Sequence, residues 1–299
     1  MKMGSGQSKE QQSVQQTDGK TANTIGIVCL IIAAMLVLIF LIIYIVQQVK
    51  RTKLQNVNLQ KDAPSALIQM DNRQSVPYRV PANNMALVSN GQEFSISFWV
   101  FLGSNYTATT GQKMIMVRGN GNTYNGSTIK ITKNTSPVIF LDSNSNTMYF
   151  AVSTSKAVKD AMTPAEIIHT VPNGTYDSGW LVAKVDYVPL QRWVYLTMTL
   201  QQTNLQVFLD GDLYSVATLG DIVNNLTGIP IIHGSSGDLL IGDSINYTPG
   251  YIAKASFYNY ALTQSDVKTM YAAGPNTNSY LSYIGLGNYA VRSPIYQVA

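Results

Sequence analysis

The strongest strand signal in this chain is Phe94-Ser95-Ile96-Ser97-Phe98-Trp99-Val100-Phe101-Leu102. Successive side chains of a β-strand point to opposite faces of a sheet, so alternate residues share a face. The positions on the first face are all apolar: Phe94, Ile96, Phe98, Val100 and Leu102. The second face carries the aromatic residues Trp99 and Phe101. We therefore predict a long strand that lies in a protein core.

The same alternation recurs downstream between turn-forming residues. The segments 138–141 and 148–153 flank a loop rich in Asp, Asn and Ser. Asp210-Gly211 supplies a hairpin turn, because glycine tolerates positive φ. Further strands are expected over residues 193–200, 205–209, 213–218, 238–242 and 250–258, and a helix with a capping box at Thr263 and Asp266 over residues 263–272. Many short strands between turns predict an all-β fold, an antiparallel two-sheet jelly-roll sandwich over residues 66–275.

Before the sandwich lies an uncharged apolar run from Ile25 to Val46. At about 1.5 Å per residue, its roughly 22 residues would span about 33 Å as a helix, against a bilayer core of about 30 Å. The run lacks the polar stripe of a buried core helix and is longer than the apolar part of a cleaved signal peptide. We therefore expect one N-terminal transmembrane helix over residues 24–46 and a single-pass membrane protein. Residues 1–23 would form a disordered polar tail, and residues 47–65 a juxtamembrane stalk.

The net charge of +4 is concentrated next to the apolar run. Residues 66–275 are nearly neutral, with 12 Lys or Arg against 13 Asp or Glu. The excess follows the run directly, at Lys50, Arg51 and Lys53, and such a trio attracts anionic lipid headgroups. Nucleic-acid binding is not expected, because the sandwich carries no basic cluster. Gly4 lies in a Met-Gly-x-x-x-Ser pattern of N-myristoylation, which requires initiation at the third residue; a chance match is the alternative.

Five motifs follow one another along the chain. They are residues 94–100, Arg192-Trp193-Val194-Tyr195-Leu196-Thr197, Leu205-Gln206-Val207-Phe208-Leu209-Asp210-Gly211, Gly250-Tyr251-Ile252, and residues 257–263 with Asp266-Val267 and Met270-Tyr271. In this order they resemble the concanavalin A-like lectin/glucanase superfamily, and within it the laminin-G-like domains. The resemblance covers residues 66–275 and implies a jelly-roll fold. Tyr260 departs from the family, which usually has a basic residue there. Since one fold hosts many functions, function needs a separate argument.

A long insertion is expected over residues 156–184, where the strand rhythm stops, and binding sites are common in such loops. It contains Trp180, Tyr176 and Asn173, an aromatic and amide set suited to sugar binding. The alternative is that Trp180 only anchors its own loop. By resemblance, Trp99 and Trp193 occupy core positions of the family.

The resemblance implies calcium as a possible cofactor, because related domains often carry it. Asp142, Asn144 and Asn146 crowd one loop and offer the oxygen ligands that calcium prefers. Loops rich in Asn and Asp are more often ordinary turns, so both interpretations stay open.

Enzyme activity is not expected. Glycoside hydrolysis needs two carboxyl groups that flank the scissile bond, and the chain has three Glu, at positions 10, 93 and 166. The Glu-x-Asp-x-x-Glu pattern of the glucanase branch is absent. The two histidines and the single cysteine show neither triad nor metal-ligand spacing.

These observations predict a membrane-anchored, non-enzymatic structural or recognition module that links a bilayer to a protein lattice or a glycan layer. An apolar, tyrosine-rich segment over residues 276–299 is expected to pack on its own domain or on a neighbour. The anchor, the sandwich and this segment together resemble virion membrane or minor capsid proteins of large DNA viruses. The alternative is a cell-surface carbohydrate-binding lectin, and a glycoside hydrolase is least favoured.

Overall fold

The computed structural model describes residues 27–43, 56–61, 67–70, 77–86, 88, 93–104, 111–125, 128–170, 176–222, 231–234, 237–243 and 245–275. The chain divides into two compact units, Met1–Leu54 and Gln55–Ala299. Several residues singled out from the sequence lie outside the described residues: Gly4, Ile25, Val46, Lys50, Arg51, Lys53 and Asn173.

The first unit contains a described helix over residues 27–43, and its side chains are apolar and exposed. Within the described residues, none of the helices combines the length and the apolar character that crossing a membrane requires. The predicted transmembrane helix over residues 24–46, and with it the single-pass membrane localisation, is therefore wrong.

The second unit is built from antiparallel strands in two large sheets. Sheet A has the order β1-β16-β4-β12-β13-β14, and β2 also pairs with β16. Its strands are β1 (Asn56–Asn58), β2 (Leu67–Gln69), β4 (Glu93–Leu102), β12 (Trp193–Gln201), β13 (Asn204–Leu209), β14 (Asp212–Thr218) and β16 (Gly250–Tyr258).

Sheet B has the order β11-β9-β8-β5-β15-β3. Its strands are β3 (Tyr78–Val80), β5 (Lys113–Arg118), β8 (Val138–Leu141), β9 (Met148–Val152), β11 (Leu181–Val185) and β15 (Leu239–Ile241). A small third sheet, sheet C, has the order β10-β7-β6. The remaining elements are β6 (Thr123–Asn125), β7 (Thr128–Thr132), β10 (Ala161–Met162), η1 (Ala82–Asn84), η3 (Leu219–Asp221), α2 (Pro164–Ile167) and α3 (Gln264–Ala272).

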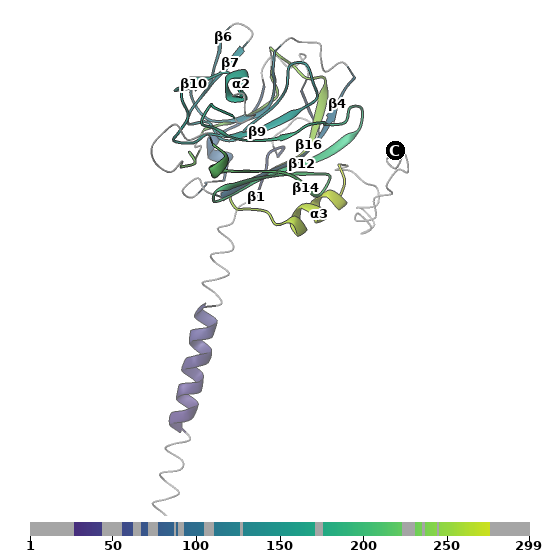
Figure 1. Cartoon of the computed structure of the whole chain (residues 1–299). Helices are drawn as coiled ribbons and strands as arrows, with labels where there is room; N and C mark the ends of the chain where they lie inside the picture. The colour runs from purple at the N-terminus through teal and green to yellow at the C-terminus, as the bar shows by residue number, and fades with distance from the viewer. Residues whose placement is uncertain are drawn as a thin grey trace, which may run out of the picture. The chain divides into compact units, whose positions relative to one another are not determined.

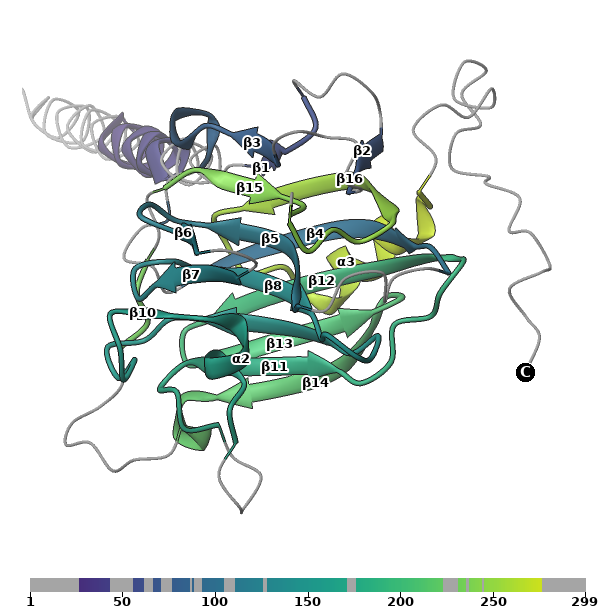
Figure 2. The ribbon, with the colours of Figure 1, turned by 90° about the horizontal axis from the view of Figure 1, so that it is seen from above.

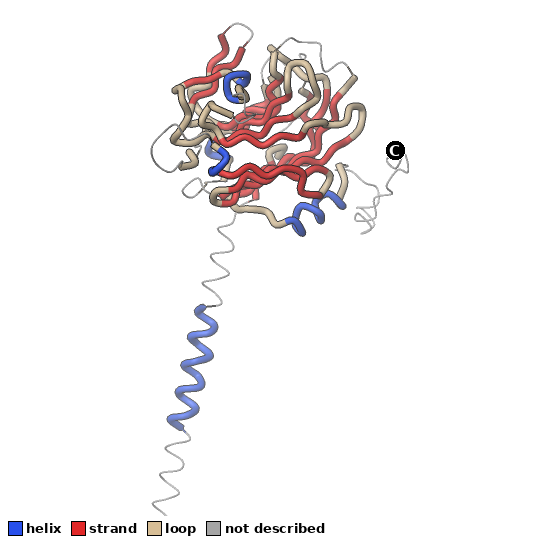
Figure 3. Tube along the Cα trace, in the orientation of Figure 1, coloured by secondary structure: helices blue, strands red, loops and turns tan. Residues whose placement is uncertain are grey.

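Sheets A and B lie face to face and enclose the main core (Figures 1 and 3). The predicted inward residues of β4 are buried in it, with Phe98 fully enclosed. Phe150 of β9 and Leu196 of β12 are buried in the same core. This packing follows from the period-two pattern, because one face of each sheet is a continuous apolar surface.

Both sheets are also covered on parts of their outer faces. Sheet C and α2 lie over sheet B (Figure 2), and α3 lies against sheet A, where Val267 packs with Trp99 and Tyr195. Two additional hydrophobic layers therefore flank the main core. The elements that cover sheet B come from β7 and from the segment that the sequence marks as an insertion.

The strands predicted from alternation are confirmed, and so is the all-β antiparallel fold. The capping box of α3 is confirmed as well: Thr263 accepts a hydrogen bond from the backbone of Asp266, and Asp266 returns one. β5 was missed, because all of its residues are buried and Met114-Ile115-Met116-Val117 shows no alternation. β11 begins at Leu181, so the insertion is shorter than predicted.

Candidate functional site

The outer face of sheet B carries a hydrophobic layer that supports the insertion. Phe140 of β8 and Val182 of β11 alternate with core residues and so point away from the main core. They pack with Ile131 of β7, Met162 of β10 and Ile167 of α2. Two stretches of chain, β7 and the continuous segment of β10 and α2, are thereby held against one face of the sheet.

A cleft of about 530 Å³ opens above this layer. Its lining residues are Val158, Lys159, Met162, Ala165, Glu166, His169, Asp177 and Ser178. The lining combines an exposed apolar side chain, Val158, with four charged or titratable ones. Small-ligand sites typically measure roughly 300–1,000 Å³ and join an apolar surface to a few convergent polar groups.

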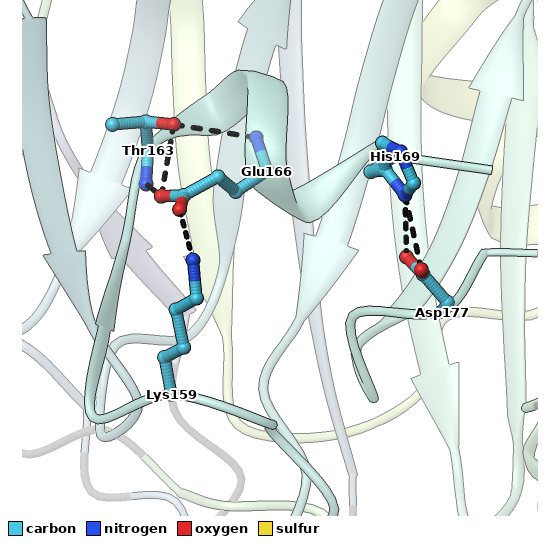
Figure 4. A network of polar contacts seen from close by, with 5 residues as sticks. All are labelled: Lys159, Thr163, Glu166, His169 and Asp177. Carbon is cyan, nitrogen blue, oxygen red and sulfur yellow. Dashed lines mark hydrogen bonds and ion pairs between the residues drawn. The ribbon is translucent and has the colours of Figure 1, made fainter.

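Glu166 is positioned by the start of α2 (Figure 4). Thr163 is the N-cap: its Oγ1 accepts the backbone N–H of Glu166 at 3.3 Å, and Glu166 Oε2 accepts the N–H of Thr163 at 2.8 Å. Glu166 Oε1 pairs with Lys159 Nζ. This capping box can be recognised in the sequence Thr163-Pro164-Ala165-Glu166, which has proline at the first helical position.

These contacts lower the pKa of Glu166 to about 2, first through the hydrogen bond from Lys159 and next through the backbone N–H of Thr163. The carboxylate is therefore ionised at neutral pH. A glycosidase general acid needs the opposite, a pKa raised towards neutrality. Glu166 is thus equipped to accept hydrogen bonds and not to donate a proton.

His169 and Asp177 form the second polar pair of the cleft (Figure 4). His169 Nδ1 lies 3.0 Å from both Oδ1 and Oδ2 of Asp177. Because a carboxylate only accepts hydrogen bonds, Nδ1 carries a proton, and in the neutral form of the ring Nε2 is an acceptor. The His169 side chain is 67% exposed, so a ligand in the cleft can reach the ring.

The pair forms because the chain doubles back on itself. Thr170 and Tyr176 form an antiparallel bridge, and the N–H of Asp177 donates to the carbonyl of His169 at 3.2 Å. The sequence analysis found no triad or metal-ligand spacing around the two histidines and did not predict the contact between His169 and Asp177. The available signal was the turn-forming run Pro172-Asn173-Gly174 between them.

The backbone next to Asp177 has a conformation that requires glycine at position 179. The N–H of Val158 donates to the carbonyl of Ser178 at 3.1 Å, which joins the two sides of the insertion. Next to it, Gly179 has φ +73°, and a Cβ there would lie 1.9 Å from the carbonyl oxygen of Lys156. Both the positive φ and the close approach require glycine.

Two of the three residues predicted to bind sugar lie next to this cleft but not in its lining. Trp180 is 1% exposed and belongs to the layer over sheet B, so its ring is covered. Tyr176 is half-buried against the same layer, and this burial raises the pKa of its hydroxyl. Asn173 lies outside the described residues.

The side chains of the predicted calcium loop make hydrogen bonds within the protein. Asp142 Oδ2 accepts from Ser145 Oγ at 2.9 Å, and Asn146 Nδ2 donates to the carbonyl of Val188 at 2.5 Å. Lys113 Nζ donates to the carbonyl of Ser143 at 3.1 Å, which brings a positive charge into the loop. Within the described residues, no group of three or more His, Cys, Asp or Glu side chains could hold a metal ion. Asp142, Asn144 and Asn146 are better explained as turn residues.

The glutamates that a hydrolase would need lie on different sides of the sandwich. Glu93 precedes the inward-facing Phe94 in β4 and so points to the outer face of sheet A. Glu166 lies over the outer face of sheet B. Both sheets separate them, and packed sheets alone are about 10 Å apart, more than the roughly 9.5 Å limit for a glycosidase pair.

Residues 129–268 match the family model described as the concanavalin A-like lectin/glucanases superfamily. No curated protein sequence matches the chain significantly. Neither this family match nor the solved structures described below support the predicted resemblance to minor capsid proteins.

Solved structures similar to this chain include botulinum neurotoxin domains. The receptor binding domain of the C/D mosaic serotype is 12% identical, with a TM-score of 0.39 over 62% of this chain and 37% of that chain. The serotype D ligand binding domain in complex with N-acetylneuraminic acid is 11% identical, with a TM-score of 0.39 over 70% of this chain and 39% of that chain. The chain thus spans well under half the length of these structures. With the family match and the two antiparallel sheets, the protein has an all-β, concanavalin A-like fold.

Proposed function

We propose that this protein is a non-enzymatic recognition module that binds a neutral carbohydrate in the cleft over sheet B. The observation that carries the proposal is the pair formed by His169 and Asp177, whose ring is oriented by the carboxylate and open to solvent. Sugar hydroxyls both donate and accept hydrogen bonds. Nε2 of His169 accepts from one hydroxyl, while the carboxylate keeps the ring in that tautomer.

Lys159 and Val158 complete the recognition surface. Lys159 Nζ has three donors, of which Glu166 uses one, and its side chain is 57% exposed. The remaining donors can reach neighbouring sugar oxygens. Val158 is 53% exposed and offers an apolar contact for the C–H face of a pyranose ring. The family match, whose description includes lectins, agrees with this class of ligand.

The charges of the cleft favour a neutral sugar over an acidic one. The lining carries one Lys cation, Lys159, against the carboxylates of Glu166 and Asp177 when His169 is neutral. An acidic sugar would therefore meet a net negative surface. The lowered pKa of Glu166 keeps its carboxylate charged well below neutral pH.

A glycan array probed with the full-length chain tests the proposal directly. We expect neutral glycans among the binders and weak signals for acidic ones. For a positive glycan, titration calorimetry should show that His169→Ala and Lys159→Ala each weaken affinity about tenfold, the loss of one hydrogen bond of about 1.4 kcal/mol.

Lys268→Ala is the matched control, since Lys268 is an exposed, ion-paired lysine on α3 at the other side of the sandwich. It should leave the affinity unchanged. Folded protein that binds no glycan, or binding that neither cleft substitution weakens, would overturn the proposal.

A further inference from the structure

The outer face of sheet A carries an aromatic row next to α3. Tyr251 of β16, Phe101 of β4 and Trp193 of β12 are direct cross-strand neighbours. The ring centroids of Phe101 and Trp193 are 5.7 Å apart, and those of Phe101 and Tyr251 are 6.4 Å apart. Leu67 of β2 pairs with Ala253 on the same face. Sequence reasoning assigned Trp193 to the core, yet it lies in this row.

The row is incompletely covered, unlike its neighbours beneath α3. Tyr251 is 37% exposed and Leu67 is 39% exposed, and Phe101 and Trp193 are half-buried. One step along the strands, Trp99 and Tyr195 are buried because Tyr271 of α3 packs on both rings. The apolar surface on sheet A therefore extends beyond the part that α3 covers.

The described chain ends beside this surface. Lys254 of β16 donates from Nζ to the carbonyl oxygens of Ala273 and Gly274, at 3.2 and 2.7 Å. This contact ties the end of α3 to the strand that carries Tyr251. Lys254 and Tyr251 are three residues apart on β16, a distance of about 10 Å. About three extended residues beyond Pro275 are enough to span this distance.

The segment after Pro275 is rich in aromatic and aliphatic residues, as expected of a segment that packs on an apolar surface. Residues 276–299 contain four tyrosines and one charged residue, Arg292. Their large aliphatic residues are Leu281, Ile284, Leu286, Val291, Ile295 and Val298. Tyr280 and Leu281 lie five and six residues beyond Pro275, within reach of the row. Aromatic pairs add to the stabilisation that burial of apolar area provides.

We propose that the C-terminal segment, residues 276–299, packs in cis on the outer face of sheet A and covers the aromatic row. The proximity of the chain exit makes the local concentration of the segment far higher than that of any free partner. The segment and α3 then form one continuous layer over sheet A, the counterpart of the layer over sheet B.

Disulfide trapping in the full-length chain tests this arrangement. With Cys29 replaced by serine, Tyr251→Cys is combined in turn with Leu281→Cys, Tyr283→Cys and Ile284→Cys. At least one combination should give an intrachain disulfide that is independent of protein concentration, because a bond requires Cα atoms within about 7 Å. Val158→Cys, which is exposed over the opposite sheet, should give none with the same partners.

Tryptophan quenching provides a second readout that needs no new cysteine. Of the three tryptophans, Trp99 and Trp180 are buried, so iodide quenching reports mainly on Trp193. Truncation after Pro275, or the milder pair Tyr280→Ser with Leu281→Ser, should increase quenching. Interchain disulfides alone would show that a second copy covers the face and would overturn the proposal. Absence of any trapped bond, or quenching that neither variant changes, would also overturn it.

Discussion

Replacing Trp180 distinguishes a supporting residue from one that contacts the ligand. Trp180 is 1% exposed, and its Nε1 has no hydrogen-bond partner within the described part of the chain. A buried aromatic side chain of this size hides about 200 Å², worth about 5 kcal/mol at about 25 cal/mol/Å². Measured aromatic-to-alanine substitutions cost about 3–5 kcal/mol. We expect Trp180→Ala to lower the free energy of unfolding by about 4 kcal/mol and to loosen the floor of the cleft.

Trp180→Phe is the informative control. It keeps most of the buried volume and breaks no hydrogen bond, so the expected loss is below about 2 kcal/mol. Urea unfolding of the full-length chain, followed by far-UV circular dichroism, measures both variants. Carbohydrate affinity should survive in the phenylalanine variant because the ring lies beneath the cleft. If Trp180→Phe abolished binding while the unfolding free energy stayed unchanged, the indole would contact the ligand and our reasoning would be refuted.

Substitutions at three further positions test a glycine conformation and two helix caps of the fold. Gly179→Ala should cost more than about 2 kcal/mol, because φ is +73° and the new Cβ would lie 1.9 Å from the Lys156 carbonyl; an unchanged thermal midpoint would contradict this. Glu166 has a folded pKa of about 2 against an ordinary value of 4.5, so its stabilisation is present above about pH 4.5 and is lost as the pH falls through 2. The urea midpoints of the wild type and Glu166→Gln should therefore differ at pH 7 and converge near pH 2, whereas a constant difference would argue against the assignment. Thr263→Ala should cost about 1 kcal/mol by removing the N-cap of α3, while Thr263→Ser should cost much less; equal costs in urea unfolding would show that the cap contributes nothing.

Of the two polar pairs in the cleft, only one can be predicted from the sequence. Thr163 and Glu166 are three residues apart, and their capping box can be recognised in the sequence. His169 and Asp177 meet only because the bridge between Thr170 and Tyr176 turns the chain back. A pair that depends on a turn has no fixed spacing, so residue order alone does not reveal it.

The role of each tryptophan also depended on tertiary structure. From the sequence, Trp180 could either bind sugar or anchor its own loop, and in the structure it is buried in the layer formed with sheet C and α2. Trp193 looked like a core residue because of its family position, but it is only partly buried against the cluster beneath α3. Whether an aromatic ring is buried is decided by the element that packs on it, which can come from a distant part of the sequence.

The amino-acid sequence by itself determined the antiparallel sandwich, the hairpin at Asp210-Gly211 and the capped helix α3. These features rest on side-chain alternation, glycine φ and capping, all of which act between neighbouring residues. Only the tertiary structure decided the hydrophobic layers over both outer faces and the position of the cleft. Those features depend on which distant side chains pack together. Local sequence patterns such as alternation or capping do not reveal those contacts.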